Sequence, residues 1–457
     1  MWANLNSVYF IGVGGIGMSA LARYFVSQSK KVAGYDRVST ALTDELIREG
    51  IHIHFEEKIS LIPKEFKDPE RTLVIYTPAI PESSQELNYF RRRGFRVIKR
   101  ATALGEVFNS GTGIGIAGTH GKTSVSTMLA EILSHSKLGC NAFLGGISKN
   151  FNSNVFIDPG SKIILAEADE YDRSFLTLFP DIGLITAMDP DHLDIYQSYG
   201  NLIKAFEIFI SQIREKGKLI LKYGLHPYIP EHLSVFTYAL NNPDAHYYAR
   251  DIQTGPNGCR FTIVTPGNII PGITLGVFGE TNIENAVGAV AVADQLGIIP
   301  EILFKSLAEF KGVKRRFDVH VYTDQTVYID DYAHHPREID SIINSVRKIF
   351  PGKKITGIFQ PHLYSRTKDF AVEFGKSLSL LDELILLDIY PARENPVPGV
   401  DSKLIFDQVE IREKVLIDKK QLFRVIRERD PEILLTMGAG DIDQFVQPIK
   451  EWLMSKR

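Results

Sequence analysis

The sequence predicts an α/β protein built on parallel sheets. Short apolar runs alternate with segments of helical periodicity along the chain, which is the pattern of βαβ units. Polar and glycine-rich clusters follow these apolar runs repeatedly, as expected where parallel strands end at a ligand-binding edge. The length of 457 residues favours about three domains.

The composition excludes several classes of protein. The 52 Lys and Arg against 55 Asp and Glu give a net charge of −3, which argues against a nucleic-acid partner. Cys140 and Cys259 are the only cysteines, so we expect no disulfide framework and a reducing compartment. No basic residue precedes Arg23 and glycines interrupt the first apolar run, so we expect neither a signal peptide nor a membrane span, and a cytoplasmic location.

Three blocks carry the alternating pattern, at residues 1–109, 110–314 and 315–457. In the first block, strands and one helix are expected, in order, over Ser7–Ile11, Met18–Ser27 (the helix), Lys31–Tyr35 and Thr72–Tyr76. In the second, they are expected over Ile114–Ala117, Thr123–His135 (the helix), Lys162–Ala166 and Asp181–Ala187, with a small β insertion over Ser234–Gly276. In the third, strands are expected over Thr326–Ile329, Lys354–Phe359, Glu383–Leu387 and Glu432–Thr436.

The most specific motif of the sequence lies between a predicted strand and a predicted helix. It reads Gly118-Thr119-His120-Gly121-Lys122-Thr123-Ser124. Glycines let backbone N–H groups approach a phosphate, the helix N-terminus favours anions, and Lys122 adds a positive charge. The hydroxyl of Thr123 is a typical Mg²⁺ ligand. Ile116 replaces the usual further glycine, so this is the shorter form of a P-loop, and a chance Gly-Lys-Thr turn is the structural alternative.

A second glycine-rich turn follows the first strand and reads Gly12-Val13-Gly14-Gly15-Ile16-Gly17. Asp36 ends the next strand, which completes a dinucleotide-binding pattern with the carboxylate on a ribose hydroxyl. A UDP-sugar contains the same diphosphate group as a dinucleotide and would fit the same pattern. A turn with a purely structural role is the alternative. Two phosphate loops in one chain favour an ATP-driven enzyme that acts on a nucleotide-linked substrate.

Charged residues also gather after predicted strands. Glu167 follows a strand beside the P-loop, where Mg²⁺ is usually held, and His192 follows the next one; a solvated turn is the alternative for each. Arg315 and Arg316 lie at a block boundary, where an arginine can close onto a γ-phosphate or serve as a linker charge. Four polar clusters follow the strands of the third block, so we expect them to line one crevice.

With these motifs the chain resembles the Mur ligases of peptidoglycan synthesis over nearly its whole length. Gly12–Gly17 is similar to the family's UDP-diphosphate loop, and Gly118–Ser124 to its ATP loop. Gly312–Phe317 is similar to a hinge motif whose second arginine contacts phosphate. The stretches 331–336, 360–367 and 390–394 resemble the alanine-adding branch of the family.

The resemblance implies a Rossmann-like UDP-binding domain, a central α/β domain of P-loop ATPase type and a Rossmann-like C-terminal domain. It implies an ATP-dependent ligase that joins L-alanine to the lactyl carboxylate of UDP-N-acetylmuramate through an acyl phosphate. The cofactors would be ATP and two Mg²⁺ ions, with Mn²⁺ able to substitute. The partners would be these small molecules, without nucleic acid or membrane, and the protein would be a monomer or homodimer.

The same resemblance implies the site residues. Those for the UDP-sugar are Gly12, Gly14, Gly15, Ile16, Gly17, Asp36, Thr77, Pro78 and Ala79. Those for ATP are Gly118, Thr119, His120, Gly121, Lys122, Thr123, Ser124, Asn282, Asn285, Arg316 and Asp331, the last on the ribose or positioning the third domain. Those for the metals are Thr123, Glu167 and His192, and those for the amino acid are Tyr332, His334, His362 and Arg366. The catalytic set is Lys122, His192, Arg316, His334 and Arg366.

The chain departs from the family pattern at three places. Thr281 stands where a histidine usually precedes Asn282, and Ala187-Met188 stands where many members have Asn-Ile. Leu363 occupies a position where many alanine-adding members have a further arginine. Several sister ligases use a carbamylated lysine to bridge metals, and Lys204 and Glu207 fall in the corresponding region of this chain.

Three rival functions fit part of the sequence. A murein peptide ligase would attach a recycled tripeptide to the same UDP-sugar, but the 360–367 and 390–394 stretches favour the alanine-adding branch. An NAD-dependent oxidoreductase would use Gly12–Gly17 but leaves Gly118–Ser124 unexplained. A non-catalytic nucleotide-binding regulator need not keep phosphate and metal residues together.

Overall fold

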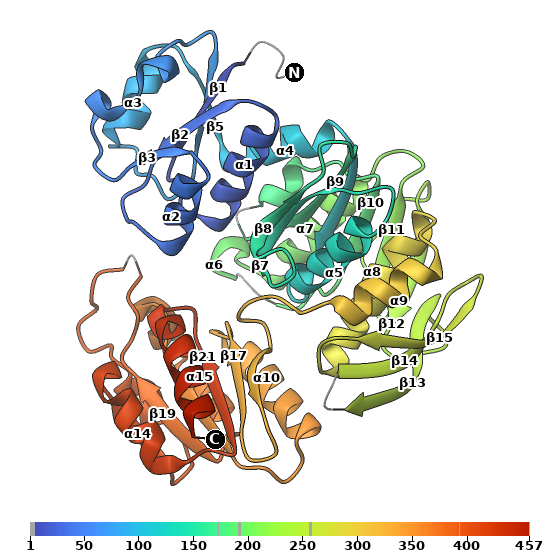
Figure 1. Ribbon diagram of the computed structural model, residues 1–457, viewed down its shortest axis with the longest axis vertical. Coiled ribbons are helices and arrows are strands. Elements are labelled where there is room, and N and C mark those ends of the chain that lie inside the picture. Colours follow the sequence, from blue (N-terminus) through green and yellow to red (C-terminus); the bar gives the residue numbers. More distant parts are fainter. Residues whose placement is uncertain (1–4, 172, 191–192, 256–257, 393, 457) are drawn as a thin grey trace. The chain divides into compact units, whose positions relative to one another are not determined.

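A computed structural model describes residues 5–171, 173–190, 193–255, 258–392 and 394–456. The chain divides into two compact units, Met1–Gly312 and Val313–Arg457 (Figure 1). This division lies two residues before the boundary expected after residue 314. Among the helices in the described ranges, none is long and apolar enough to span a bilayer.

The first unit begins with a five-stranded parallel sheet in the order β3-β2-β1-β4-β5. Its strands are β1 (Ser7–Ile11), β2 (Lys31–Tyr35), β3 (His52–His54), β4 (Thr72–Tyr76) and β5 (Arg96–Lys99). Its helices are α1 (Ile16–Ser27), α2 (Ala41–Arg48), α3 (Gln85–Arg92) and α4 (Arg100–Asn109). The three predicted strands are confirmed at the same residues, and the predicted helix begins two residues earlier. The strand order reverses between β1 and β4, and the carboxyl ends of two such strands are where sheets of this type commonly bind ligands.

The unit continues with a ten-stranded sheet in the order β15-β14-β13-β12-β11-β10-β6-β9-β7-β8. Its strands are β6 (Thr112–Ala117), β7 (Asn141–Ser148), β8 (Ser153–Ile157), β9 (Ile163–Ala168), β10 (Ile182–Ile185), β11 (Lys218–Lys222), β12 (Ser234–Ala239), β13 (Tyr247–Gly255), β14 (Gly258–Val264) and β15 (Ile269–Leu275). The centre is parallel, and β8, β14 and β15 are antiparallel to their neighbours. The stretch expected as a β insertion is therefore β-structured, but it extends the central sheet.

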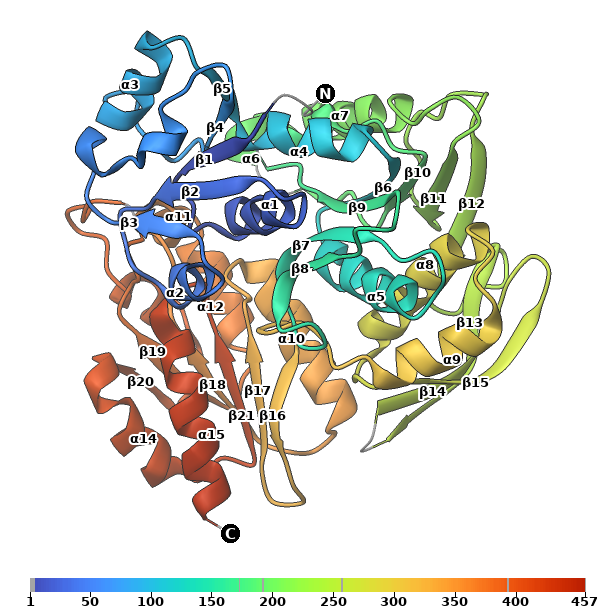
Figure 2. The same ribbon diagram turned by 45° about the horizontal axis from the view of Figure 1, so that its top comes forward.

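Helices cover both faces of this sheet. They are α5 (Lys122–Ser134), α6 (Leu193–Tyr196), α7 (Tyr199–Ser211), α8 (Glu280–Gln295) and α9 (Pro300–Glu309). Figure 2 shows α7 on one side of the central strands, and α5 with α8 beside it on the other. The middle of α8 is built from small buried residues such as Ala286 and Ala289, which let it pack closely against α5. On the opposite face, Phe206 and Phe209 of α7 belong to the same hydrophobic core as Phe10 of β1 and Phe25 of α1.

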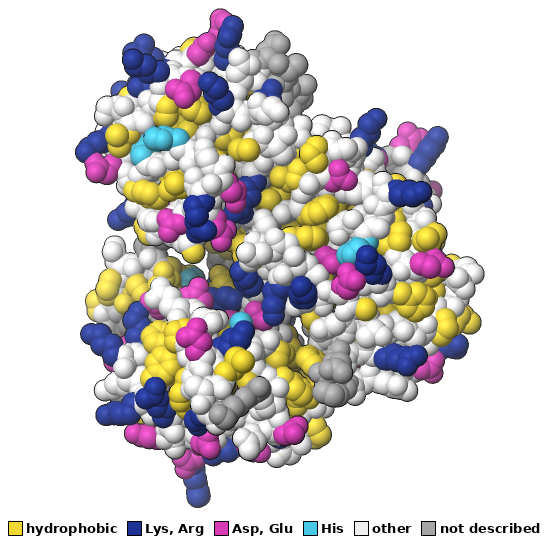
Figure 3. Space-filling model, in the orientation of Figure 1, with side chains coloured by type: hydrophobic (Ala, Val, Ile, Leu, Met, Phe, Trp, Pro, Cys, Tyr) yellow, Lys and Arg dark blue, Asp and Glu magenta, His cyan; other side chains and the backbone are white. Residues whose placement is uncertain are grey.

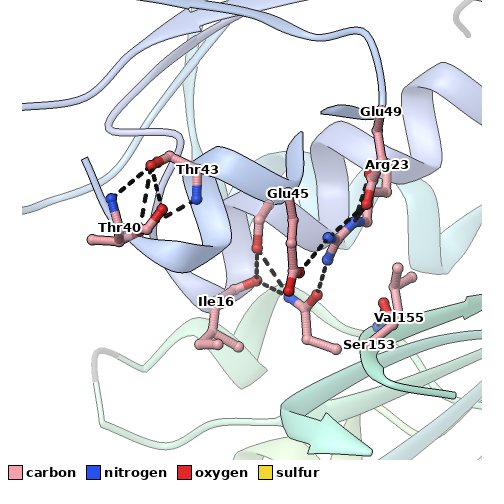
Figure 4. Close-up of polar contacts among 10 residues, drawn as sticks. Ile16, Arg23, Thr40, Thr43, Glu45, Glu49, Ser153 and Val155 are labelled. Carbon is pink, nitrogen blue, oxygen red and sulfur yellow. Dashed lines mark hydrogen bonds and ion pairs between the residues drawn. The ribbon is translucent and has the colours of Figure 1, made fainter. Parts of the chain in front are cut away.

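A polar junction joins α1 to β8 inside the first unit (Figure 4). The Nη1 atom of Arg23 donates to Oδ1 of Asn154 at 2.7 Å, and its Nε donates to Glu49 at 2.8 Å. The amide of Asn154 donates in turn to Oγ of Ser19 at 3.0 Å. Because α1 begins directly after the first glycine loop, this junction anchors that loop's helix to the central sheet.

The second unit contains a six-stranded sheet in the order β16-β17-β21-β18-β19-β20. Its strands are β16 (Asp318–Tyr322), β17 (Val327–Asp331), β18 (Ile355–Phe359), β19 (Glu383–Leu387), β20 (Lys414–Ile417) and β21 (Ile433–Met437), and all pairs except β16–β17 are parallel. Its helices are α10 (Pro336–Ile349), α11 (Tyr364–Asp369), α12 (Ala371–Leu378), α13 (Lys403–Phe406), α14 (Leu422–Arg429) and α15 (Val446–Ser455).

The four strands predicted in this unit are confirmed, one of them at the same residues (β19) and the others with ends that differ by one or two residues. The largest difference is at β17, which includes Asp330 and Asp331, both expected in a loop. Asp330 is tolerated in the buried strand because it accepts hydrogen bonds from Thr436 at 2.6 Å and Arg315 at 3.2 Å. On the face drawn in Figure 3, basic and acidic side chains are scattered over both units, as the near-neutral net charge suggests.

Candidate active site

The P-loop connects β6 to α5 and is held by backbone contacts to the end of β10. The N–H of Thr119 donates to the carbonyl of Ala187 at 3.0 Å, and the N–H of Thr186 donates to the carbonyl of Ala117 at 2.9 Å. Gly118 and Gly121 have φ values of +133° and +80°, which disfavour residues with a side chain. A Cβ atom at Gly118 would lie 2.1 Å from Oγ1 of Thr186. The loop therefore needs its glycines for both conformation and close packing.

Lys122 is the first residue of α5, and a buried carboxylate holds its ammonium group. Its Nζ lies 2.9 and 2.8 Å from the two carboxylate oxygens of Glu170, and it donates to the carbonyl of Gly118 at 2.7 Å. Burial alone would favour the neutral amine, but Glu170, Asp169 and Glu167 together hold the pKa of Lys122 above its usual value. The lysine is therefore charged and aimed back over the loop.

The other predicted ATP residues lie around this loop. Thr123 is buried and Ser124 half-buried in the first turn of α5. Nε2 of His120 lies 3.8 Å from Oδ2 of Asp189. Asn285 on α8 approaches the loop, because a Cβ at Gly121 would lie 2.9 Å from its Oδ1. Asn282 instead donates to the carbonyl of Phe278 at 2.7 Å, which closes the turn before α8.

The predicted metal residues can be placed only in part. Glu167 belongs to β9, and the register of this strand puts it beside Ile116, two residues before the loop. Its Oε2 accepts the N–H of Gly145 at 3.0 Å. Glu167 and its neighbouring carboxylates at the carboxyl edge of the sheet are suitable ligands for Mg²⁺. His192 lies outside the described residues.

Gly145 on β7 is a residue that sequence reasoning missed. A Cβ atom there would lie 2.1–2.6 Å from three atoms of the Glu167 carboxylate group. Gly145 thus provides the space in which that carboxylate sits and the N–H that orients it. A glycine inside a strand often marks such a close approach, and this was the available signal.

The first glycine loop is organised by Asp36 and Thr77. The N–H of Gly12 donates to the carbonyl of Tyr35 at 2.7 Å, and the N–H of Gly14 donates to Oδ2 of Asp36 at 2.7 Å. The carboxylate predicted to hold a ribose thus also holds the loop. Gly12 has φ +86°, and a Cβ there would lie 2.5 Å from Cγ2 of Thr77 at the end of β4. The predicted residues after β1, β2 and β4 are therefore brought together.

The two other glycines at the end of this loop, Gly15 and Gly17, have different surroundings. A Cβ at Gly15 would meet nothing within 4 Å, so this residue faces open space at the start of α1. A Cβ at Gly17 would lie 2.9 Å from Nη1 of Arg100. Arg100 follows β5 and brings a positive charge to the loop, which suits a diphosphate. Sequence reasoning missed Arg100 because the strand before it, β5, was not predicted either.

In the second unit, Arg315 and Arg316 have different surroundings. Arg315 forms an ion pair with buried Asp330 at 3.2 Å and donates to the carbonyl of Gly438. Arg316 is 39% exposed, and its Nη1 is 3.9 Å from Oε1 of Glu338. Both guanidinium groups lie over the ring of Tyr332, at 5.1 and 5.5 Å from its centre. Arg315 therefore holds the fold, whereas Arg316 is available to an anion.

Asp331 holds the turn that carries these arginines. One carboxylate oxygen accepts the N–H of Phe317 at 2.7 Å, and the other accepts the N–H of Ala333 at 2.8 Å. Burial raises the pKa of Asp331 to about 6, although Arg316 and the two N–H groups oppose the shift. These contacts favour the positioning role among the two roles expected for Asp331.

The predicted amino-acid residues form a cluster of rings and one cation. The rings of Tyr332 and His334 are 5.2 Å apart, and those of His334 and His362 are 6.0 Å apart. Nη1 of Arg366 lies 3.4 Å from Nδ1 of His362. Burial, with the nearby His334 and Arg366, lowers the pKa of His362 to about 4. Burial also lowers the pKa of His334. The cluster thus combines neutral imidazoles with one permanent positive charge.

Comparison with known families identifies the class of protein. The chain matches the Mur ligase family catalytic domain over residues 7–112, the Mur ligase middle domain over 116–293 and the Mur ligase glutamate ligase domain over 315–440. These matches cover most of the chain, and the chain belongs to the Mur ligase family.

Comparison with individual members shows which branches of the family the chain is similar to. A UDP-N-acetylmuramate–L-alanine ligase of Parabacteroides distasonis is 51% identical, with 98% of this chain and 97% of that protein aligned. The crystal structure of UDP-N-acetylmuramate–alanine ligase from Thermotoga maritima superposes with a TM-score of 0.81 at 26% identity, covering 99% and 100% of the two chains. A murein peptide ligase from Psychrobacter arcticus gives 0.69 at 19% identity, with 97% of each chain covered, and so shares the fold.

Proposed function

We propose that this Mur ligase joins L-alanine to the lactyl carboxylate of UDP-N-acetylmuramate, using ATP and releasing ADP and phosphate. The observation that carries the proposal is the charged Lys122 in a P-loop beside the Glu167 carboxylate. This arrangement is suited to phosphoryl transfer. The 51% identity to an alanine-adding ligase along the whole chain supports the acceptor.

The first half of the reaction makes an acyl phosphate. The lactyl carboxylate attacks the γ-phosphorus of ATP, the bond to the β–γ bridging oxygen breaks, and ADP leaves. Lys122 and the N–H groups at the start of α5 neutralise the phosphate oxygens, so the chain contributes mainly positioning and charge. Thr123 and Glu167 would hold Mg²⁺, which supplies further charge neutralisation on the phosphates.

The second half forms the amide. The amine of L-alanine attacks the acyl carbon, phosphate leaves, and the amine loses a proton. Arg366 is suited to the carboxylate of the amino acid, because a guanidinium pairs with carboxylates through two parallel hydrogen bonds. His334 and His362 have lowered pKa values and are neutral near pH 7, so they can accept a hydrogen bond from the amine without adding positive charge beside it.

The proposal also requires the two compact units to cooperate. The P-loop belongs to Met1–Gly312, and Arg316 and Arg366 belong to Val313–Arg457. We propose that closure of the units completes the site in the reacting complex. The turn that carries Arg316 is fixed to the second unit through Asp331, so the bending is expected at Gly312–Val313. We place the reaction in the cytoplasm, which agrees with two free cysteines.

The deciding experiment measures ADP release from Mg-ATP with UDP-N-acetylmuramate present throughout. One arm has no amino acid, one has L-alanine, and one has L-alanyl-γ-D-glutamyl-diaminopimelate. Turnover with L-alanine alone supports the proposal. Turnover with the tripeptide alone assigns the murein peptide ligase activity instead, and no turnover in any arm overturns the proposed ligase activity.

A further inference from the structure

A second group of metal-type side chains lies at the far end of α5 from the P-loop. Glu131 lies in the last turn of α5, His135 is the residue that caps this helix four positions later, and Glu309 is the last residue of α9. One ligand atom from each residue lies within 4.8 Å of the other two. Nε2 of His135 is 3.2 Å from Oε2 of Glu309, and its Nδ1 is 3.7 Å from Oε1 of Glu131. Ligand atoms around a tetrahedral cation with bonds of about 2.0–2.1 Å are separated by about 3.3 Å, so small side-chain rotations would suffice.

The imidazole of His135 is oriented as a metal ligand. Its Nδ1 lies 3.0 Å from the backbone carbonyl of Glu131. A carbonyl oxygen can only accept, so Nδ1 carries the proton in this contact and the neutral ring has its lone pair on Nε2, the atom that faces Glu309. A second hydrogen bond of this kind commonly fixes the ring of a metal-binding histidine.

Glu131 supplies the second observation that points to a ligand. Its side chain is only 5% exposed. Its Oε1 accepts the amide of Asn150 at 3.0 Å, but within the described part of the chain its Oε2 is buried without a hydrogen-bond partner. A buried carboxylate oxygen without a partner is unfavourable, and a cation would satisfy it.

Asn150 holds the cluster in place before any ion binds. Besides Glu131, its amide donates to the backbone carbonyl of Glu309 at 2.9 Å, and its Oδ1 accepts the N–H of Lys311 at 2.8 Å. Asn150 therefore ties α5 to the end of α9 and to the segment that leads out of the first unit. Asn150, which is not itself one of the ligand residues, thus orients the Glu131 carboxylate and holds the backbone of Glu309 next to it.

We propose that Glu131, His135 and Glu309 form a structural site for a zinc-type divalent cation, separate from the magnesium site of the ligase reaction. One imidazole and two carboxylates suit Zn²⁺, with water as a fourth ligand, whereas Mg²⁺ prefers oxygen ligands in octahedral geometry. Glu131 is nine residues from Lys122 along α5, or about 13 Å at the rise of an α-helix. The bound cation would cross-link α5 to α9 just before the chain leaves the first unit.

The test is a Zn²⁺ titration of the full-length protein, followed by competition with a chromophoric chelator. Excess Mg²⁺ is present and nucleotide is absent, so that the P-loop region does not contribute. We expect one site in the wild type and at least tenfold weaker binding in His135→Ala and Glu309→Gln. Glu309 is 53% exposed, so its variant is expected to fold normally. His232→Ala, at an exposed histidine of the same unit, is the matched control and should bind as the wild type does.

A second readout tests whether the bound ion acts where we place it. Zn²⁺ should raise the unfolding temperature of the wild type and of His232→Ala, but not of His135→Ala. Absence of a Zn²⁺ site in the wild type would overturn the proposal. Equal binding in the wild type, His135→Ala and Glu309→Gln would overturn it as well, because the ion would then occupy another place. Ligase turnover decides neither result, so this test is independent of the proposed function.

Discussion

Both carboxylate oxygens of Glu170 lie within 2.9 Å of the ammonium group of Lys122 in the P-loop. Glu170 is fully buried, so this pair holds the lysine at the loop and keeps it charged. A phosphate that binds the loop must either contact Lys122 while Glu170 remains paired with it, or replace Glu170 as the partner of Lys122. The strength of this pair therefore bears on both the stability of the loop and the affinity for ATP.

Replacing Lys122 separates these two effects. Lys122→Ala should lower ATP turnover by about 10²–10³-fold or more, because a preorganised charge on the phosphates is lost. It should also lower the unfolding temperature, since Glu170 is left buried without its cation. The double variant Lys122→Ala with Glu170→Gln should recover the unfolding temperature but not the turnover. Calorimetry should show unchanged UDP-N-acetylmuramate binding in both, and loss of that binding would contradict the assignment of two separate phosphate loops.

The first glycine loop offers a matched pair of substitutions. Gly15→Ala adds a methyl group that meets no protein atom within 4 Å, whereas at Gly14 a Cβ would lie 2.8 Å from Thr43 and 2.9 Å from Asp36. Gly15→Ala should leave the unfolding temperature unchanged and raise the KM for the UDP-sugar several-fold, by crowding the diphosphate. Gly14→Ala should lower both stability and affinity. An unchanged KM in Gly15→Ala would mean that the loop is only a structural turn.

Gly145 is expected to act through Glu167. Gly145→Ala places a Cβ into the space of the Glu167 carboxylate, so the Mg²⁺ concentration for half-maximal turnover should rise, with little change in the KM for L-alanine. Gly200→Ala is the control, since a Cβ there meets nothing within 4 Å. If Gly145→Ala lowered turnover at saturating Mg²⁺ and left the Mg²⁺ dependence unchanged, Glu167 would not be a ligand.

Substitution of the two adjacent arginines should have opposite effects on turnover and stability. Arg316→Ala should reduce kcat by about 10²-fold or more and keep the unfolding temperature, because its guanidinium is 39% exposed and makes only peripheral contacts, to Glu338 at 3.9 Å and to the ring of Tyr332. Arg315→Ala should instead destabilise the second unit by about 3–5 kcal/mol, since the buried Asp330 keeps its hydrogen bond from Thr436 but loses the cation that neutralises its charge. Thermal unfolding and steady-state kinetics of both variants check this, and reversed results would exchange the roles.

A buried network in the first sheet should make stability depend on pH. The hydroxyl of Tyr9 lies 2.7 Å from Nε2 of His54 and 2.7 Å from Oε2 of Glu86, and burial raises the pKa of Glu86 to about 7. The pKa of Glu86 is thus about 4.5 in the unfolded chain and about 7 in the folded protein. Between these two pH values the carboxyl group is protonated in the folded state and ionised in the unfolded state. The stabilisation that this proton contributes is therefore fully present below pH 4.5, and it is lost as the pH rises through about 7.

Glu86→Gln removes this titration. The variant should gain up to about 3 kcal/mol relative to the wild type between pH 5 and pH 8. Chemical unfolding at both values measures the change. A difference between variant and wild type that is the same at pH 5 and pH 8 would show that Glu86 keeps an ordinary pKa in the folded protein.

The sequence by itself determined the strands and the two glycine loops. β1, β2, β4 and β19 have the predicted residues, because a buried parallel strand is a continuous apolar run that ends in polar residues. The loops could be recognised since the φ values and close approaches they need are met locally by glycine. The prediction that a site lies at the carboxyl edge of each sheet rests on the same local pattern.

Only the tertiary structure decided which side chains meet. Gly145 lies against Glu167 from another strand, Arg100 reaches Gly17 from the end of β5, and Glu170 holds Lys122. Arg315 and Arg316 look alike in sequence, but only one of them is paired with a buried carboxylate. Such pairs are set by strand order and by the packing of distant segments, which no local spacing encodes, because each contact depends on the fold of the whole unit.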